Sequence, residues 1–196
     1  GVVTTAADGT FRFDDVSPGE YTVQEDDAVG FISTSDIDGT NDGEIAVTLL
    51  SGTENAGNDF LDTELGTITG LVLTDVDGDG MFDPEDTSGI DAVVVTLLDG
   101  TGSVVGVTTT ALDGSYLFTG LPPGDYTVVE TTPAGLESTG DTDGGTDDVV
   151  AVTLPSGGLE IADFLDTEPA AISGTVFNDL DGDGVFDPED TTGIAG

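Results

Sequence analysis

The sequence contains no cysteine, no histidine and no lysine, and Arg12 is its single basic residue. Without cysteine the chain forms no disulfide and performs no thiol chemistry. The three missing residue types also remove most of the general bases and nucleophiles that enzymes use. A glycosidase-like pair of carboxylates stays compatible with the composition, but acidic residues are so frequent here that a close pair carries little information. We therefore expect a protein that is not an enzyme.

Basic charge is almost absent, whereas 41 residues are acidic, which gives a formal net charge of −40. Nucleic-acid binding by phosphate neutralisation needs Lys and Arg and is excluded. The charge also argues against docking on anionic lipid surfaces, and no apolar run is long enough to span a bilayer. We expect no direct membrane insertion of this segment. Self-repulsion opposes folding unless external cations intervene, either a divalent metal or concentrated salt.

An internal repeat organises the chain. The hexapeptide DFLDTE occurs at 59–64 and again at 163–168, an offset of 104 residues. We therefore predict three units: 1–64 is the C-terminal part of one repeat, 65–168 is a complete repeat, and 169–196 is the N-terminal part of a third. Because the sequence begins and ends inside repeats, we expect it to be a segment of a longer tandem array, with neighbouring repeats as its partners.

Local patterns in the complete repeat predict β-structure throughout. Segments rich in Val, Thr, Ile and Tyr, several of them alternating in polarity, are bounded by turns rich in Gly, Pro and Asp. The expected strands are 67–74, 92–98, 103–110, 115–119, 125–131 and 148–154. About seven short strands in a unit of this size are typical of an antiparallel β-sandwich. The joints at 62–66 and 166–170 are short, so we expect neighbouring units to touch and the array to be a semi-rigid rod.

Two acidic loops, DVDGDGMFDPED at 75–86 and DLDGDGVFDPED at 179–190, carry the most specific functional signal. Carboxylates occupy loop positions 1, 3, 5, 9 and 12, and a glycine occupies position 6, where a sharp turn is needed. This is the spacing of an EF-hand calcium loop, with Asp in place of Glu at position 12. The predicted Ca²⁺ ligands are Asp75, Asp77, Asp79, the carbonyl of Met81, Asp83 and Asp86, and Asp179, Asp181, Asp183, the carbonyl of Val185, Asp187 and Asp190. The alternative is an acidic surface turn.

A second acidic pattern, DIDGTNDG at 36–43 and DTDGGTDD at 141–148, is less specific. Its carboxylates would form a weaker second cation site, composed of Asp36, Asp38 and Asp42 in the first unit and of Asp141, Asp143 and Asp147 in the complete unit. A solvated surface loop explains the same pattern equally well. The sequence leaves both interpretations open.

Three stretches together resemble a known family. GTITGLVLTDVDGDGMFDPEDTSGID at 66–91, GSYLFTGLPPGDYTVVETTPAGL at 114–136 and the two copies of DFLDTE resemble the B domain of serine–aspartate-repeat surface proteins. That domain is a Greek-key β-sandwich of the Cna B-type, prealbumin-like class. The resemblance covers the complete repeat and both partial ones. It implies an all-β fold of tandem sandwiches, with calcium-stabilised units in a cell-surface adhesin or extracellular fibre.

One departure from that class concerns covalent cross-linking. Many Cna B-type domains carry an isopeptide bond between Lys and Asn or Asp, assisted by a Glu, and Glu25 and Glu130 match the place of that Glu. The chain has no Lys, so the bond does not form. Glu130 is then either an ordinary strand residue or an additional cation ligand.

The combined interpretation is a calcium-stabilised structural repeat of an extracellular stalk, surface adhesin or fibre, which gives length and stiffness. Self-assembly into filaments and a single-chain stalk both fit the sequence. The alternative is a carbohydrate- or protein-binding module of a secreted protein. Exposed aromatics would favour it, but there is no Trp, and we interpret all three tyrosines, Tyr21, Tyr116 and Tyr126, as core residues.

Overall fold

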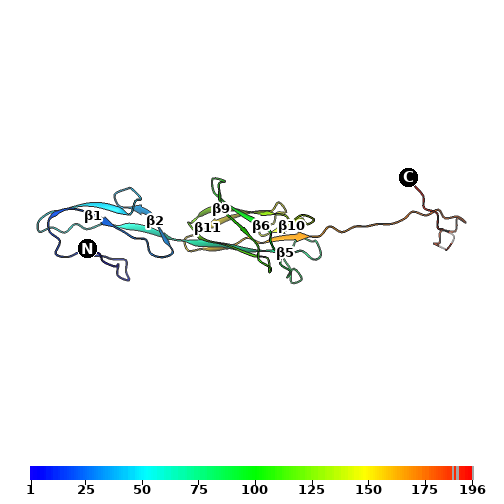
Figure 1. Cartoon of the computed structure of the whole chain (residues 1–196), viewed down its shortest axis with the longest axis horizontal. Helices are drawn as coiled ribbons and strands as arrows, with labels where there is room; N and C mark the ends of the chain where they lie inside the picture. The colour runs from blue at the N-terminus through cyan, green and yellow to red at the C-terminus, as the bar shows by residue number, and fades with distance from the viewer. Residues whose placement is uncertain (187, 189, 196) are drawn as a thin grey trace.

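The computed structural model describes residues 1–186, 188 and 190–195. Within these residues the regular structure consists of strands and no helix, which confirms the predicted all-β class. The three units follow one another along the long axis of the molecule, with the complete unit in the middle (Figure 1). No helix that is long and apolar enough to cross a membrane is found in the part of the chain that the structure describes.

The complete unit is a sandwich of two sheets. Its strands are β5 (Gly66–Thr74), β6 (Val94–Asp99), β7 (Val104–Thr109), β8 (Ser115–Leu121), β9 (Gly124–Thr131), β10 (Glu137–Asp141), β11 (Val149–Leu154), β12 (Leu159–Ile161) and β13 (Phe164–Thr167). One sheet has the order β10-β13-β5-β12, with β8 also paired to β5, and the other has the order β11-β9-β6-β7. Most pairs are antiparallel, whereas β12 and β13 run parallel to β5.

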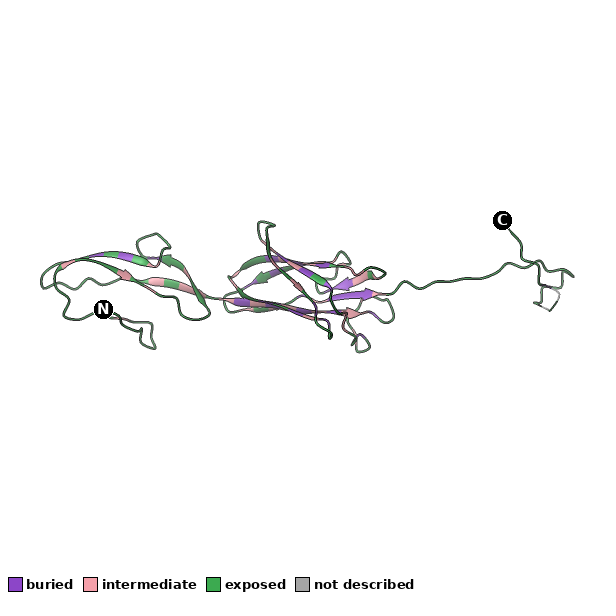
Figure 2. Cartoon of the chain, in the orientation of Figure 1, coloured by how far each residue is buried: buried purple, intermediate pink, exposed green. Residues whose placement is uncertain are grey.

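The core of this sandwich comes from the inward faces of both sheets. Ile68 and Val72 on β5 alternate with less buried residues and pack together with Val128 on β9 and Phe164 on β13. These four side chains are fully buried, and each contributes about 1.5–3 kcal/mol to folding. Buried residues gather in the middle unit (Figure 2).

The tyrosine interpretation holds in the complete unit and fails in the first. Tyr116 and Tyr126 are buried, at 4% and 8% exposure, but Tyr21 is 41% exposed. Tyr126 lies on β9, which pairs with β6. The first unit has no counterpart of β6 in this sequence, so Tyr21 has less to pack against. Its hydroxyl nevertheless donates to the carbonyl of Ser17 over 2.7 Å, as that of Tyr126 donates to Pro122.

The first unit consists of two antiparallel pairs. Its strands are β1 (Gly19–Gln24), β2 (Phe31–Asp36), β3 (Glu44–Leu49) and β4 (Phe60–Glu64), paired as β1-β3 and β2-β4. Only Leu65 separates β4 from β5, and the joint is hydrogen-bonded: the amide of Gly157 donates to the carbonyl of Glu64 over 3.0 Å. The first and the complete unit therefore touch, as the short joint predicts. Beyond β13 the chain runs as an extended segment to the third unit (Figure 1). The expectation that the units also touch at the joint 166–170 is therefore wrong for the part of the chain that the structure describes.

Candidate metal centre

The acidic loop of the complete unit begins where β5 ends and is attached to β13. The amide of Asp75 donates to the carbonyl of Asp166 over 2.8 Å, and the hydroxyl of Thr167 donates to the carbonyl of Asp75 over 2.9 Å. Asp75 is only 1% exposed. The backbone of Asp75, the first predicted ligand, is thus held by the sheet without help from a cation.

Carboxylates at loop positions 1, 3 and 5 converge. One oxygen each of Asp75, Asp77 and Asp79 lies within 4.8 Å of the others. The two oxygens of Asp75 accept the amides of Gly78 and Gly80, over 2.7 and 2.9 Å. The loop therefore wraps around its own first residue, as a cation-binding loop does.

Glycine is required at loop position 6 for two reasons. Gly80 has a φ of +75°, in the left-handed region that side chains disfavour. A Cβ there would also lie 2.4 Å from the carbonyl oxygen of Thr139, next to β10. The turn predicted from the spacing is therefore present, and it packs the loop directly against β10.

The electrostatics of the loop favour a cation. Burial raises the pKa of Asp75, but hydrogen bonds from the Thr139 hydroxyl and from the amides of Gly80 and Gly78 outweigh it, so its pKa lies below the ordinary value. The pKa of Asp77 is raised by desolvation and by repulsion from neighbouring carboxylates, Asp79 first among them. A cation between these groups would remove that repulsion.

The later loop positions depart from a simple EF-hand arrangement. Asp83 forms a second close group with Asp77 and Glu85, again within 4.8 Å. Asp86 is buried and accepts the amides of Val76 and Asp83, over 3.0 and 3.2 Å, so its carboxylate closes the loop. Glu85, which the EF-hand spacing does not predict, joins the cluster. Calcium coordination by all six predicted ligands of this loop, Met81, Asp83 and Asp86 included, stays a prediction. The donor set consists of oxygens alone, which fits a hard cation such as Ca²⁺.

The loop of the third unit repeats this geometry. Asp179, Asp181 and Asp183 converge within 4.8 Å, and Asp179 accepts the amides of Gly182 and Gly184 over 2.7 and 2.9 Å. The amide of Leu180 donates to Asp190 over 3.0 Å, as Val76 does to Asp86. Asp187 lies outside the described residues, and a role for Val185 stays a prediction. Unlike Asp75, Asp179 is exposed, because no sandwich covers it.

The weaker pattern forms turns. In the first unit Asp36 accepts the amides of Asp42 and Gly43 over 3.1 and 3.0 Å, and Asp38 accepts the amide of Thr40. In the complete unit Asp141 accepts the amide of Gly145 over 2.8 Å. Among the described residues, neither predicted set forms a close group of three carboxylates. The two sets are Asp36, Asp38 and Asp42 in the first unit, and Asp141, Asp143 and Asp147 in the complete unit. A cation at these positions stays a prediction.

Two further acidic groups were not predicted as sites, although the sequence left Glu130 open as an additional cation ligand. Glu130, Asp148 and Asp166 converge within 4.8 Å in the complete unit, and Glu25, Asp27 and Asp62 do so in the first. Each group includes a member that is far from the others in the sequence, Asp166 in the complete unit and Asp62 in the first, so no local spacing reveals either group. The available signal was the recurrence of both YTV-x-E and DFLDTE in each unit.

Comparison with known proteins agrees with this architecture. A model of the SdrD B-like domain matches residues 66–158, which is most of the sandwich and the whole acidic loop. The complete unit is an SdrD B-like domain. Membership of this family confirms the cell-surface location that the sequence resemblance implies.

Two curated relatives of this SdrD B-like chain come from staphylococci. Serine-aspartate repeat-containing protein D of Staphylococcus aureus (strain Newman) is 35% identical over 144 residues, covering 70% of this chain and 11% of that protein. Serine-aspartate repeat-containing protein F of Staphylococcus epidermidis (strain ATCC 12228 / FDA PCI 1200) is 30% identical over 219 residues, covering 100% of this chain and 13% of that protein. The chain thus spans a small part of either relative.

Solved structures similar to the chain include a protein of Bacillus anthracis and one of Streptococcus agalactiae. The Bacillus anthracis TIE protein aligns with a TM-score of 0.45 and 21% identity, covering 85% of this chain and 28% of that one. The minor pilin GBS52 of Streptococcus agalactiae aligns with a TM-score of 0.43 and 13% identity, covering 84% and 66%. At these scores the fold assignment rests on the strand pairing described above.

Proposed function

We propose that this chain is a calcium-stabilised structural repeat of an extracellular stalk, surface adhesin or fibre, and that its units provide length and stiffness. The observation that carries the proposal is the acidic loop. Three carboxylates converge in it twice along the chain, and in the complete unit it is hydrogen-bonded to the last strand of the sandwich. Family membership and the serial arrangement of the units support the same function.

In this proposal Asp75, Asp77 and Asp79 hold the cation, together with Asp83 and with Glu85 or Asp86. Unneutralised, two carboxylates about 4 Å apart repel by about 1 kcal/mol in water, and by more where they are partly buried. A bound Ca²⁺ would turn this repulsion into attraction. It would also tie together the end of β5, the middle of β10 at Thr139 and the end of β13.

The position of the loop suggests how calcium would stiffen an array. Strand β5 begins at Gly66, at the joint with the first unit, and ends at the loop. The loop therefore lies at the opposite end of the sandwich, beside Thr167, where the chain leaves for the next unit. A filled loop would fix that exit, and an empty one would loosen it.

Neighbouring repeats are the proposed partners, in a single chain or in a self-assembled filament. The units have no Lys for an isopeptide bond, so cations are the remaining candidates for strong cross-links within a unit. The composition, which lacks Lys, His and Cys, favours a passive mechanical function over catalysis.

The proposal is tested by imaging the chain with saturating calcium and with a chelator at constant ionic strength. We expect the spread of angles between the complete and the third unit to increase when calcium is removed. The angle at the joint between the first and the complete unit serves as an internal control, because it lies far from the loop of the complete unit. An unchanged spread at the exit would contradict the proposal.

A further inference from the structure

A buried acidic group lies between the two sheets, apart from the loops. Glu130 belongs to β9 of one sheet, Asp166 belongs to β13 of the other, and Asp148 precedes β11. Glu130 is 3% exposed and Asp166 is fully buried. One carboxylate oxygen from each of the three residues lies within 4.8 Å of the other two. The group thus joins both halves of the sandwich.

These carboxylates lack the partners that burial demands. Both oxygens of Glu130, both of Asp166 and one of Asp148 are buried without a hydrogen-bond partner. The second oxygen of Asp148 accepts the hydroxyl of Thr132 over 2.6 Å. Ionised carboxylates are rarely left buried and uncompensated, so these must share either protons or a cation. Burial and the neighbouring Asp166 raise the pKa of Glu130 to about 9, in line with this need.

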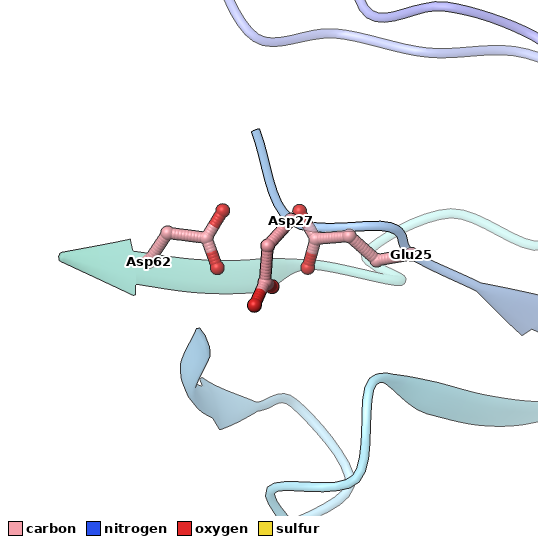
Figure 3. A group of neighbouring side chains, drawn as sticks. All are labelled: Glu25, Asp27 and Asp62. Carbon is pink, nitrogen blue, oxygen red and sulfur yellow. The ribbon is translucent and has the colours of Figure 1, made fainter. Parts of the chain in front are cut away.

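The first unit contains the same group with one member exchanged. Glu25 and Asp62 correspond to Glu130 and Asp166 in the repeat alignment, and their third partner is Asp27. The three side chains point toward one another (Figure 3). Asp27 corresponds to Thr132, so the third carboxylate comes from a different position of the repeat.

The backbone explains why the exchange is feasible. Asp148 has a φ of +61°, and Gly43, the residue at the corresponding position of the first unit, has a φ of +68°. The carbonyl of Asp148 accepts the amide of Glu130 over 2.9 Å, and the carbonyl of Gly43 accepts the amide of Glu25 over 2.9 Å. The backbone turn is therefore the same in both units, and glycine is sufficient to form it. The side chain of Asp148 is therefore not needed by the turn, and it is oriented toward the acidic group.

We propose that Glu130, Asp148 and Asp166 form a second cation site, buried between the sheets and suited to a hard divalent cation such as Ca²⁺, and that Glu25, Asp27 and Asp62 form its counterpart in the first unit. Oxygen-only ligands are those that calcium prefers. A shared proton needs two carboxylates, whereas a cation gains from a third. Both units provide that third carboxylate, by different residues, which favours the cation over the proton.

The first test counts calcium ions bound per chain by isothermal titration calorimetry and native mass spectrometry. Glu130→Gln keeps the size of the side chain and removes its charge, so we expect it to fold and to bind one ion fewer than the unmodified chain. Glu137→Gln, an exposed residue of β10, is the matched control and should bind the full number. An unchanged number in Glu130→Gln would overturn the proposal.

This site is separable from the loops. A chain carrying Asp77→Ala and Asp79→Ala should lose the ion of the loop and keep the buried ion. Adding Glu130→Gln to that chain should remove one further ion. If Glu130→Gln has no effect in either background, the buried site is rejected, whatever the loop does.

The second test transplants the arrangement of the first unit. Asp148→Gly introduces the residue that the same turn has at Gly43, so the backbone should be preserved, and calcium affinity at this site should fall at least about tenfold. Adding Thr132→Asp recreates the arrangement of Asp27 and should restore most of the affinity. A pair of carboxylates that merely share a proton would leave calcium binding unchanged in both variants, and that result would overturn the proposal.

Discussion

The backbone amide of Asp75 donates a 2.8 Å hydrogen bond to the carbonyl of Asp166. Asp75 is the first residue of the acidic loop, and the carboxylate of Asp166 belongs to the buried acidic group with Glu130. The surface loop and the buried group are thus connected through a single pair of neighbouring strands, β5 and β13. A cation at either place would order the backbone that supports the other.

Calcium should raise the melting temperature of the complete unit. A ligand that binds only the folded state at a hundredfold excess over its dissociation constant adds about 2.7 kcal/mol. For a unit of this size that corresponds to a rise of about 10–20 °C. Differential scanning calorimetry in calcium and in EDTA, at equal ionic strength, measures it. Coinciding curves would refute metal stabilisation.

Removing single loop carboxylates should abolish most of the stabilisation that the loop contributes. Asp77→Ala and Asp79→Ala each delete one of the three converging carboxylates, and neither residue is buried. We therefore expect little change in EDTA and a much smaller rise of melting temperature with calcium. The same calorimetric comparison measures both quantities.

Asp99→Ala is the control for those variants. Asp99 caps its own turn by accepting the amides of Thr101 and Ser103, over 2.9 and 3.0 Å. Its loss should lower stability to the same extent with and without calcium, as the loss of a comparable backbone cap does. An equal loss of the calcium effect in Asp99→Ala would mean that total charge, and not coordination, is responsible.

The metal-free chain should become less stable as the pH rises from about 4.5 to about 9. Burial first, and then repulsion from Asp166, raises the pKa of Glu130 from 4.5 to about 9, and burial raises that of Asp166 from 3.8 to about 6. A raised pKa stabilises the folded state below the ordinary value, and this contribution is lost as the pH approaches the folded value. Repulsion from Asp148 adds to the raised pKa of Glu130, and burial first, then the charges of Asp163 and Glu130, raises the pKa of Tyr116.

Urea unfolding in EDTA at pH 5, 7 and 9 measures this dependence. Glu130→Gln, which resembles the protonated acid, should flatten the decline between pH 7 and 9. Saturating calcium should flatten it as well, because a bound cation replaces the proton. The decline of stability with pH is compared in the unmodified chain in EDTA, in Glu130→Gln in EDTA and in the unmodified chain with calcium. An equal decline in all three would exclude Glu130 as its origin.

The joint between the first and the complete unit should loosen when Ser156 is replaced. Its hydroxyl oxygen accepts the amide of Glu64 over 3.0 Å and the hydroxyl of Thr63 over 2.9 Å. These contacts are exposed, so Ser156→Ala should change the melting temperature little but widen the range of angles at the joint. Small-angle scattering measures the change. Ser103→Ala, in a turn of the complete unit, is the control, and an equal widening there would contradict the assignment.

Short-range chemistry made the acidic loops predictable. The loop at 179–190 makes the same aspartate-to-amide hydrogen bonds as the loop at 75–86, although no sandwich supports it. These bonds join residues three or five positions apart, so the sequence spacing is enough to specify them. Segments rich in Val, Thr, Ile and Tyr, several of them alternating in polarity, likewise located the strands that became β5, β6, β7, β8, β9 and β11.

Strands β10, β12 and β13 were not predicted, because they are short and their partners lie far away in the sequence. DFLDTE, which marks the repeat and its joint, is largely strand: β4 in the first unit and β13 in the complete one. In β13 the strand includes the fully buried Asp166, a residue type that local polarity assigns to the surface.

The sequence by itself determined the all-β class and the two acidic loops, since both depend on patterns within a few residues. It also determined the repeat, because the same short motif recurs at an offset of 104 residues. The tertiary structure alone decided which residues meet across the sheets. Similar local motifs, GEYTVQE and GDYTVVE, leave Tyr21 exposed and Tyr126 buried, according to whether a strand like β6 lies beside them. Glu130 and Asp166 meet only because β9 and β13 belong to sheets that pack face to face, a long-range contact that no local spacing encodes.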